Sequence, residues 1–275
     1  MQYKISKIFD KKNKKIIIGV IHFPPLLGYR EFPGFEVCLD NAIEDLQAFE
    51  KGGVDAVIIE NNYDIPHKIK VGPETVAAMT FLGKEIAKNT KLPLGVSVLW
   101  NDFEAALAIA KVIGAKFIRV PAFVDRVKTD YGIAEGNAKE VLVFRKKISA
   151  ENIALFTDIQ VKHAKLLKKR PIEESALEAI KLGSDGLIIT GKWTGQAPEI
   201  EKLEAVRKAV GDFPIFVGSG ADKDNLKSLF KYANGAIVST SLKRGSAKKS
   251  EVNVKNWKQR INKFRVKEIV RVSRV

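Results

Sequence analysis

The chain alternates eight times between a short apolar run and a stretch with apolar residues at helical spacing. Most of the short runs are apolar throughout, as expected for parallel strands buried on both faces. Eight such repeats in 275 residues match the size of a (β/α)8 barrel. The predicted strands are residues 16–21, 56–60, 94–98, 117–120, 153–158, 186–190, 215–217 and 236–238. We therefore predict an α/β fold, a single (β/α)8 TIM barrel.

Capping residues mark the predicted helices. A Gly or Asn just past a helix favours a left-handed C-cap, and such joints occur at 52–55, 114–116, 183–185 and 234–235. The predicted helices are residues 36–51, 73–89, 101–113, 171–182, 198–210 and 222–232. A last helix at 253–265 would place Val254, Trp257, Ile261 and Phe264 on one stripe that closes the barrel. Residues 266–275 fit a short strand, a frayed tail or a partner contact.

The net charge of +15 lies at the two ends of the chain. Residues 1–15 carry +5, residues 243–275 carry +10, and the rest is neutral. We predict a basic N-terminal segment at 1–15, the barrel at 16–265 and a basic C-terminal tail at 266–275. The basic ends could dock on an anionic membrane surface or an acidic protein partner. The preferred interpretation is a solvated charged surface.

Several classes of protein do not fit this composition. No apolar run approaches the roughly 20 residues of a transmembrane helix, and the first 15 residues lack the apolar core of a secretory signal. The single cysteine, Cys38, excludes an intrachain disulfide and is interpreted as a packed small residue. We expect a cytoplasmic protein, with a peripheral membrane location and homo-oligomerisation left open. No RNP, KH or helix-turn-helix pattern supports a nucleic-acid partner.

Polar residues cluster where the predicted strands end, the position of catalytic groups in barrels. They are His22, Glu60, Asn61, Asp64, Arg119, Asp158, Lys162 and His163. Glu60 or Asp158 could act as a general base, with His163 as an acid/base partner of Asp158. Lys162 or Arg119 could stabilise a developing anion. A purely structural Glu60–Arg119 ion pair is the alternative, and Lys162 could instead bind phosphate or face solvent.

Small residues end the last two predicted strands. Gly218, Ser219 and Gly220 follow one, and Ser239, Thr240 and Ser241 follow the next. Loops after strands 7 and 8 of such barrels commonly bind phosphate, and Gly191 could contribute from the preceding strand. We therefore predict a phosphorylated small-molecule ligand. The alternative is that these residues only form tight turns.

Cofactor signals are weak. No GxGxxG follows a strand and no GxxxxGK[ST] occurs, so a nucleotide cofactor is not expected. A divalent metal stays open, and the candidate ligands are Glu60, Asp158 and His163, with His22 and Asp64 nearby in the predicted ring.

Seven ordered motifs resemble the BtpA/SgcQ family, which is named for a photosystem I biogenesis protein. They are GVIHFPPLLG (19–28), EKGGVDAVIIENNYD (50–64), GPETVAAMT (72–80), ALAIAKVIGAKFIRV (106–120), DIQVKHA (158–164), TGKWTG (190–195) and VGSGADKDNL…ANGAIVSTSLKR (217–244). The resemblance implies a barrel of the ribulose-phosphate-binding type, and photosynthetic members are peripheral thylakoid proteins. It marks the eight polar strand-end residues together with Gly218, Ser219 and Gly220. His22, Asn61 and Asp64 are then expected to bind substrate.

Two departures from the family pattern affect the predicted site. Gln160 stands where a His is expected, and Ser97–Asp102 replaces an Asn-Val-Leu-Arg-Asn-Asp-like run. These changes remove an imidazole and a guanidinium from the expected site. Trp100 would instead offer an aromatic platform to the substrate.

Two functions remain. The first is an enzyme acting on a phosphorylated metabolite, for which isomerisation, aldol-type cleavage and hydrolysis all fit. The alternative is a non-catalytic assembly or biogenesis factor, of the photosystem I type in phototrophs, docking through its basic termini. The polar ring favours the enzyme, because burying that many charged groups is costly without a function.

Overall fold

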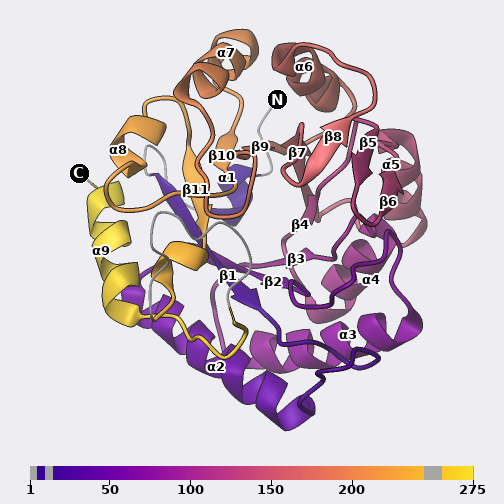
Figure 1. Ribbon diagram of the computed structural model, residues 1–275, viewed down its shortest axis with the longest axis vertical. Coiled ribbons are helices and arrows are strands. Elements are labelled where there is room, and N and C mark those ends of the chain that lie inside the picture. Colours follow the sequence, from indigo (N-terminus) through magenta and orange to yellow (C-terminus); the bar gives the residue numbers. More distant parts are fainter. Residues whose placement is uncertain (1–4, 10–14, 245–255, 275) are drawn as a thin grey trace.

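The computed structural model describes residues 5–9, 15–244 and 256–274. Eight parallel strands close into a barrel in the order β1-β11-β10-β9-β7-β4-β3-β2 (Figure 1). These strands are β1 (Ile16–His22), β2 (Ala56–Glu60), β3 (Leu94–Ser97), β4 (Phe117–Val120), β7 (Ala154–Ile159), β9 (Gly186–Ile189), β10 (Ile215–Val217) and β11 (Gly235–Val238). The predicted (β/α)8 barrel is confirmed, and each predicted strand agrees to within one residue at either end.

Helices surround the barrel and cover the outer faces of its strands (Figure 1). They are α2 (Phe35–Gly52), α3 (Pro73–Lys88), α4 (Phe103–Ile113), α5 (Ala138–Lys147), α6 (Ile172–Lys181), α7 (Ile200–Val210), α8 (Leu226–Leu229) and α9 (Lys263–Ser273). Helix α5 was not among the predicted helices. It is rich in charged residues and begins at a side-chain cap. Asn137 Oδ1 accepts the backbone N–H of Glu140 at 3.2 Å there.

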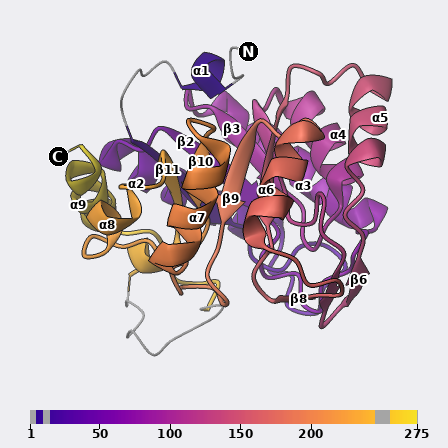
Figure 2. The same ribbon diagram turned by 90° about the horizontal axis from the view of Figure 1, so that it is seen from above.

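A small antiparallel sheet was also not predicted. It joins β5 (Val127–Thr129), β6 (Gly132–Ala134) and β8 (Ala164–Leu166) in the order β6-β5-β8. The β5–β6 turn is fixed by Thr129, whose Oγ1 accepts the N–H of Tyr131 at 3.0 Å. The sheet lies at the carboxyl ends of the barrel strands, on the side opposite the N-terminal helix α1 (Ile5–Ile8) (Figure 2). It therefore adds a wall to the end of the barrel where the predicted site lies.

The predicted last helix is wrong in position. Residues 253–255, and with them Val254, lie outside the described residues, and the helix α9 begins only at Lys263. Asn262 sets this start, because its Oδ1 accepts the N–H of Phe264 at 2.9 Å. Phe264 is 68% exposed, and Val266 and Ile269 instead form the buried face. The boundary predicted at 265/266 therefore falls inside α9, which packs against α2.

Residues 5–9 of the N-terminal segment close the amino end of the barrel (Figure 2). Ile5 and Phe9 are buried in the same apolar cluster as the inward-facing strand residues. The ring of Phe9 lies 6.3–6.5 Å from the rings of Phe117, Phe156 and Phe216, measured between centroids. The segment is thus a basic sequence that carries apolar anchors, rather than only a solvated face.

We expect Phe9→Ala to lower the free energy of unfolding by about 2 kcal/mol. A fully packed Phe→Ala change costs about 3–5 kcal/mol, but a terminal segment can detach locally and limits the loss. Urea denaturation measures the change. Lys7→Ala, at an exposed position two residues away, is the control and should leave the midpoint unchanged. Equal midpoints for all three proteins would show that the segment does not close the barrel in solution.

Candidate functional site

The predicted polar ring exists because alternate residues of each strand face the barrel axis. The lower inward positions are apolar, and Val20, Ile58, Phe117 and Phe156 fill them. Two residues further along each of these strands, the inward position is polar. These next positions are His22, Glu60, Arg119 and Asp158. The apolar core and the polar floor of the site are thus two residues apart along each of these strands, which is one repeat of the alternation between inward- and outward-facing side chains.

Arg119 joins two carboxylates in this layer. Its Nε and Nη2 donate to the two carboxylate oxygens of Asp158 at 2.8 Å each, and its Nη1 donates to Glu60 Oε2 at 3.3 Å. Burial disfavours the charged guanidinium, but the charges of Asp158 and Glu60 outweigh it and raise the pKa of Arg119. The structure therefore contains the Glu60–Arg119 ion pair that was the alternative interpretation. Arg119 bonds Asp158 at shorter distances than Glu60, so Asp158 is the main partner of Arg119.

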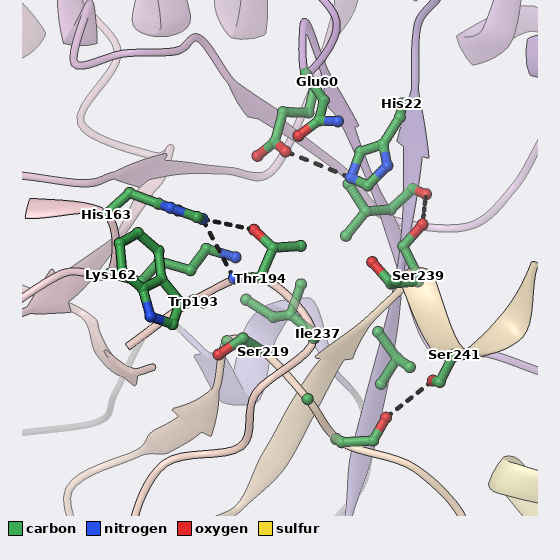
Figure 3. A pocket seen from close by; sticks show the side chains of 18 of the residues that line it. His22, Glu60, Lys162, His163, Trp193, Thr194, Ser219, Ile237, Ser239 and Ser241 are labelled. Atoms are coloured by element: carbon green, nitrogen blue, oxygen red, sulfur yellow. Dashed lines mark hydrogen bonds and ion pairs between the residues drawn. The ribbon is translucent and has the colours of Figure 1, made fainter. Parts of the chain in front are cut away.

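Glu60 also contacts His22, whose Nε2 lies 3.4 Å from Glu60 Oε1 (Figure 3). Burial alone would raise the pKa of Glu60, but the His22 hydrogen bond and the charge of Arg119 hold it well below its usual range. Burial lowers the pKa of His22 to about 4. At neutral pH the site therefore presents an ionised carboxylate beside a neutral imidazole.

The predicted Asp158–His163 acid/base pair is wrong. Both oxygens of Asp158 are occupied by Arg119, and Asp158 does not line the cavity. His163 faces the loop after β9, where its Nε2 accepts the backbone N–H of Thr194 at 3.2 Å (Figure 3). Burial and the nearby charge of Lys162 lower the pKa of His163 to about 4. His163 is thus a neutral ring that holds this loop over the barrel.

Asn61 and Asp64, which were expected to bind substrate, do not line the cavity. Both side chains are fully buried. Asn61 Oδ1 accepts the N–H of Leu99 at 2.7 Å, and Asp64 Oδ1 accepts the N–H of Leu26 at 2.8 Å. They fix the loops that follow β1 and β3, because each satisfies a backbone donor that would otherwise be buried without a partner.

A cavity of about 910 Å³ lies above the polar layer. His22, Glu60, Arg119 and Lys162 line it from the strand ends. An aromatic wall consists of His67, Trp100, Tyr131 and Trp193, so Trp100 stands where the predicted aromatic platform would be. Gln160, which replaces the family's expected His, does not line the cavity; its side-chain Nε2 donates to the Arg170 carbonyl at 3.0 Å.

The loops after β10 and β11 line another side of the cavity (Figure 3). The hydroxyls of Ser239 and Ser241 donate to the carbonyls of Val20 and Ala221, at 3.0 and 2.9 Å. Among the described residues, none accepts the backbone N–H of Gly220, Ala221, Thr240 or Ser241. Two pairs of unused amide donors therefore border the cavity, as an anion site requires.

Gly191 plays a different part from the one predicted. It does not line the cavity, and its N–H donates to Ser219 Oγ at 2.9 Å. Ser219 Oγ in turn donates to the Gln196 carbonyl at 2.8 Å. These bonds hold the loop after β9 against Gly220, so the Gly191 N–H and the Ser219 hydroxyl shape the anion site without being free donors for it.

The part of the chain that the structure describes contains no cluster of metal-ligand side chains. No three His, Cys, Asp or Glu side chains converge there as a ligand set. Of the candidate ligands, Asp158 is engaged with Arg119 and His163 with Thr194. Among the described residues, the candidate set of Glu60, Asp158 and His163 is therefore not assembled as a ligand cluster.

Lys162 differs from the other charged residues of the site. It is half-buried and lines the cavity, and its Nζ makes no hydrogen bond or ion pair with the residues described. Burial and the nearby charge of Arg119 lower the pKa of Lys162 to about 8. The ammonium group of Lys162 therefore loses its proton at a lower pH than that of an ordinary lysine.

We expect Lys162→Met to be at least as stable as the wild-type protein at pH 7. Below pH 8 the folded wild type holds an ammonium without a partner, whereas between pH 8 and 10.5 only the unfolded chain keeps that proton. The free energy of unfolding of the wild-type protein, relative to that of the variant, should therefore increase as the pH rises through this window. Urea denaturation at pH 7 and pH 9.5 measures the difference. A variant whose loss of stability relative to the wild type is larger at pH 7 than at pH 9.5 would contradict this account.

Sequence reasoning missed two contributors to the site. Tyr131 comes from the β5–β6 turn and lines the cavity, and the only signal for it was the turn-forming Gly132. Lys243 was counted in the basic C-terminal end at 243–275, yet it is 3% exposed and its Nζ donates to Tyr63 Oη at 2.8 Å. Its charge adds to the burial that lowers the pKa of His22. Nothing in a basic stretch of sequence distinguishes a buried lysine from solvated ones.

Comparison with known proteins agrees with this architecture. The model of the BtpA family matches residues 13–270. A protein from Synechocystis sp. named photosystem I biogenesis protein BtpA is 40% identical over 231 residues, 83% of this chain and 80% of its own. A protein from Archaeoglobus fulgidus is 39% identical over 232 residues, 84% of this chain and 93% of its own.

Solved structures share the fold at low identity. N-(5'-phosphoribosyl)anthranilate isomerase from Pyrococcus furiosus superposes with a TM-score of 0.57 at 14% identity, covering 94% of this chain and 98% of that one. A structure titled native KDPGal superposes equally, with a TM-score of 0.57 at 13% identity, covering 96% and 97%. No helix among the described residues is both long and apolar enough to cross a membrane. The match over most of its length and the 40% identity show that this chain belongs to the BtpA family.

Proposed function

We propose that this protein is an enzyme that binds a phosphorylated small molecule in the cavity at the carboxyl end of its barrel. The observation that carries the proposal is the set of unused backbone donors at Gly220, Ala221, Thr240 and Ser241. Converging N–H groups bind phosphate well, because they need no charged partner and are already oriented. Arg265 also lines the cavity.

The rest of the cavity supports chemistry on the bound molecule. Glu60 presents an ionised carboxylate and Lys162 an amine with a lowered pKa, and perturbed groups that face one cavity are typical of active sites. Arg119 is held by Asp158 and Glu60, so it would orient Glu60 and stabilise a developing negative charge from a fixed position. His22 would contact the substrate as a neutral donor or acceptor.

A thermal-shift experiment tests the phosphate site. The ligands are inorganic phosphate, ribose 5-phosphate and ribulose 5-phosphate, each with and without Mg²⁺, Mn²⁺ or Zn²⁺, and ribose is the matched control without phosphate. A ligand at a hundred times its dissociation constant should stabilise the fold by about 2.7 kcal/mol. We expect stabilisation by at least one sugar phosphate and none by ribose. No shift from any phosphate compound would refute the proposal.

A second function is favoured by one comparison, the 40% identity to the Synechocystis protein named for photosystem I biogenesis. In that case the barrel would be an assembly factor that docks on an anionic membrane or an acidic partner. Lys258, Lys263 and Lys267 form an exposed basic group at and before α9. Salt-sensitive sedimentation with vesicles containing phosphatidylserine, lost when these three lysines are replaced by glutamate, would support docking. Absence of sedimentation at low salt would count against it.

A further inference from the structure

The amine of Lys162 has a free approach to the cavity. Its side chain ends toward the middle of the cavity, and no interaction is drawn to it (Figure 3). The other cation of the floor, Arg119, already uses three nitrogen atoms on Asp158 and Glu60. Lys162 is therefore the floor residue with an amine available to a bound molecule.

The backbone around Lys162 is held on both sides. Its own N–H donates to Thr190 Oγ1 at 3.0 Å. Gln160 and His163 both have left-handed backbone angles, with φ of 50° and 57°, and their N–H groups donate to Asp125 Oδ2 at 3.1 Å and to the Lys192 carbonyl at 3.2 Å. Non-glycine residues adopt this conformation only when the surroundings impose it, and such residues concentrate at functional sites.

The electrostatic surroundings favour a neutral amine. Burial and the charge of Arg119 lower the pKa of Lys162 to about 8. At pH 7 about one amine in ten is then unprotonated, compared with roughly one in three thousand for an ordinary lysine. A lysine that is desolvated beside another cation is a recognised form of activated nucleophile.

We propose that Lys162 forms an imine with the carbonyl carbon of a phosphorylated aldehyde or ketone, whose phosphate lies on the free N–H groups after β10 and β11. The phosphate part of this inference rests on the proposed function. The amine lone pair forms the new C–N bond while the carbonyl π electrons move to oxygen. The oxygen takes up two protons, one released by the nitrogen and one from solvent. The C–O bond then breaks and water leaves as the nitrogen lone pair forms the C=N bond of the protonated imine, and no electrons are gained or lost overall. The negative charges of Glu60 and Asp158 stabilise the protonated imine.

Reductive trapping with pyridoxal 5'-phosphate and sodium borohydride tests the imine. This probe carries both an aldehyde and a phosphate, and borohydride converts its imines into stable secondary amines. Peptide mass mapping gives the labelling rate of each lysine. We expect Lys162 to react at least ten times faster at pH 7.5 than Lys116, an exposed lysine at the amino end of β4. The rate should rise with pH to a plateau above pH 8. Labelling of Lys162 no faster than Lys116 would overturn the proposal.

Two further measurements separate the amine from the phosphate site. Inorganic phosphate should slow the labelling of Lys162 and leave that of Lys116 unchanged. Fast labelling without this protection would refute the phosphate site and leave the nucleophile standing. Lys162→Met should keep the thermal shift with inorganic phosphate. Loss of that shift, together with slow labelling of the wild type, would show that Lys162 only binds phosphate.

Discussion

Arg119→Met should lower the free energy of unfolding by about 3–5 kcal/mol at pH 7, the usual cost of breaking a buried ion pair. The guanidinium is 6% exposed, and it is the cation that contacts both Asp158 and Glu60, which are 1% and 5% exposed. Methionine fills a similar volume, so packing changes little. Two carboxylates then stay buried without the charge that balanced them, and that imbalance accounts for the loss.

The pH dependence identifies charge as the cause. The deficit of Arg119→Met should be smaller at pH 5 than at pH 8, because protonation neutralises carboxylates that have lost their cation. Guanidinium chloride would screen these charges, so urea denaturation is the measurement. Arg126→Met removes an exposed pair with Glu135 and should change stability little. A deficit that is the same at both pH values would mean that packing, and not charge, is the role of Arg119.

A conservative variant guards against a protein that fails to fold. Arg119→Lys keeps the charge but loses the two parallel bonds to Asp158, so it should fold with a smaller deficit than Arg119→Met. If lysine proved as harmful as methionine, the geometry of the fork would matter more than its charge.

Gly220→Ala should abolish stabilisation by phosphate compounds and lower the free energy of unfolding by about 2–3 kcal/mol. Gly220 has φ of 65°, and a methyl group there would overlap backbone atoms of Gln196 and Ala197. Backbone cannot move aside as a side-chain end can, so the loop after β10 would shift. The N–H groups of Gly220 and Ala221 would then no longer converge with those of Thr240 and Ser241.

Gly114→Ala is the matched control for this variant. Gly114 has a similar φ of 79°, but nothing lies within 4 Å of the added methyl group. It should cost about 1 kcal/mol for the left-handed conformation alone and leave the phosphate thermal shift intact. Thermal-shift titration of both variants with inorganic phosphate gives the comparison. Equal shifts in the two variants would place the phosphate elsewhere.

Local patterns explain why the barrel was predictable and where prediction failed. The strands could be found because parallel strands buried on both faces need continuous apolar runs. The last helix was placed too early because two apolar stripes overlap in the sequence, one through Trp257 and Ile261 and one through Val266 and Ile269. Helical periodicity does not choose between them. The choice was made by the Asn262 cap and by the packing of Val266 against Gly52 in α2.

The predicted contacts between site residues failed for a related reason, because spacing along the sequence does not give the contacts between strands. Asp158 and His163 were paired because a carboxylate can orient an imidazole, yet Asp158 bonds Arg119, 39 positions away. Contact between neighbouring strands depends on register, which joins Arg119 to Phe156 and so brings Asp158 within reach. His163, beyond the end of β7, instead bonds Thr194 in the loop after β9.

The sequence by itself determined the fold class, the strand ends where polar residues gather, and the glycine- and serine-rich loops after β10 and β11. Each of these depends on residue type and spacing over a few positions, which strand and helix periodicity translate directly into structure. Only the tertiary structure decided which of the polar residues face the cavity. That outcome depends on register and on loop hydrogen bonds between distant segments, and these directed Asn61, Asp64 and Asp158 into the framework and left Lys162 free at the centre.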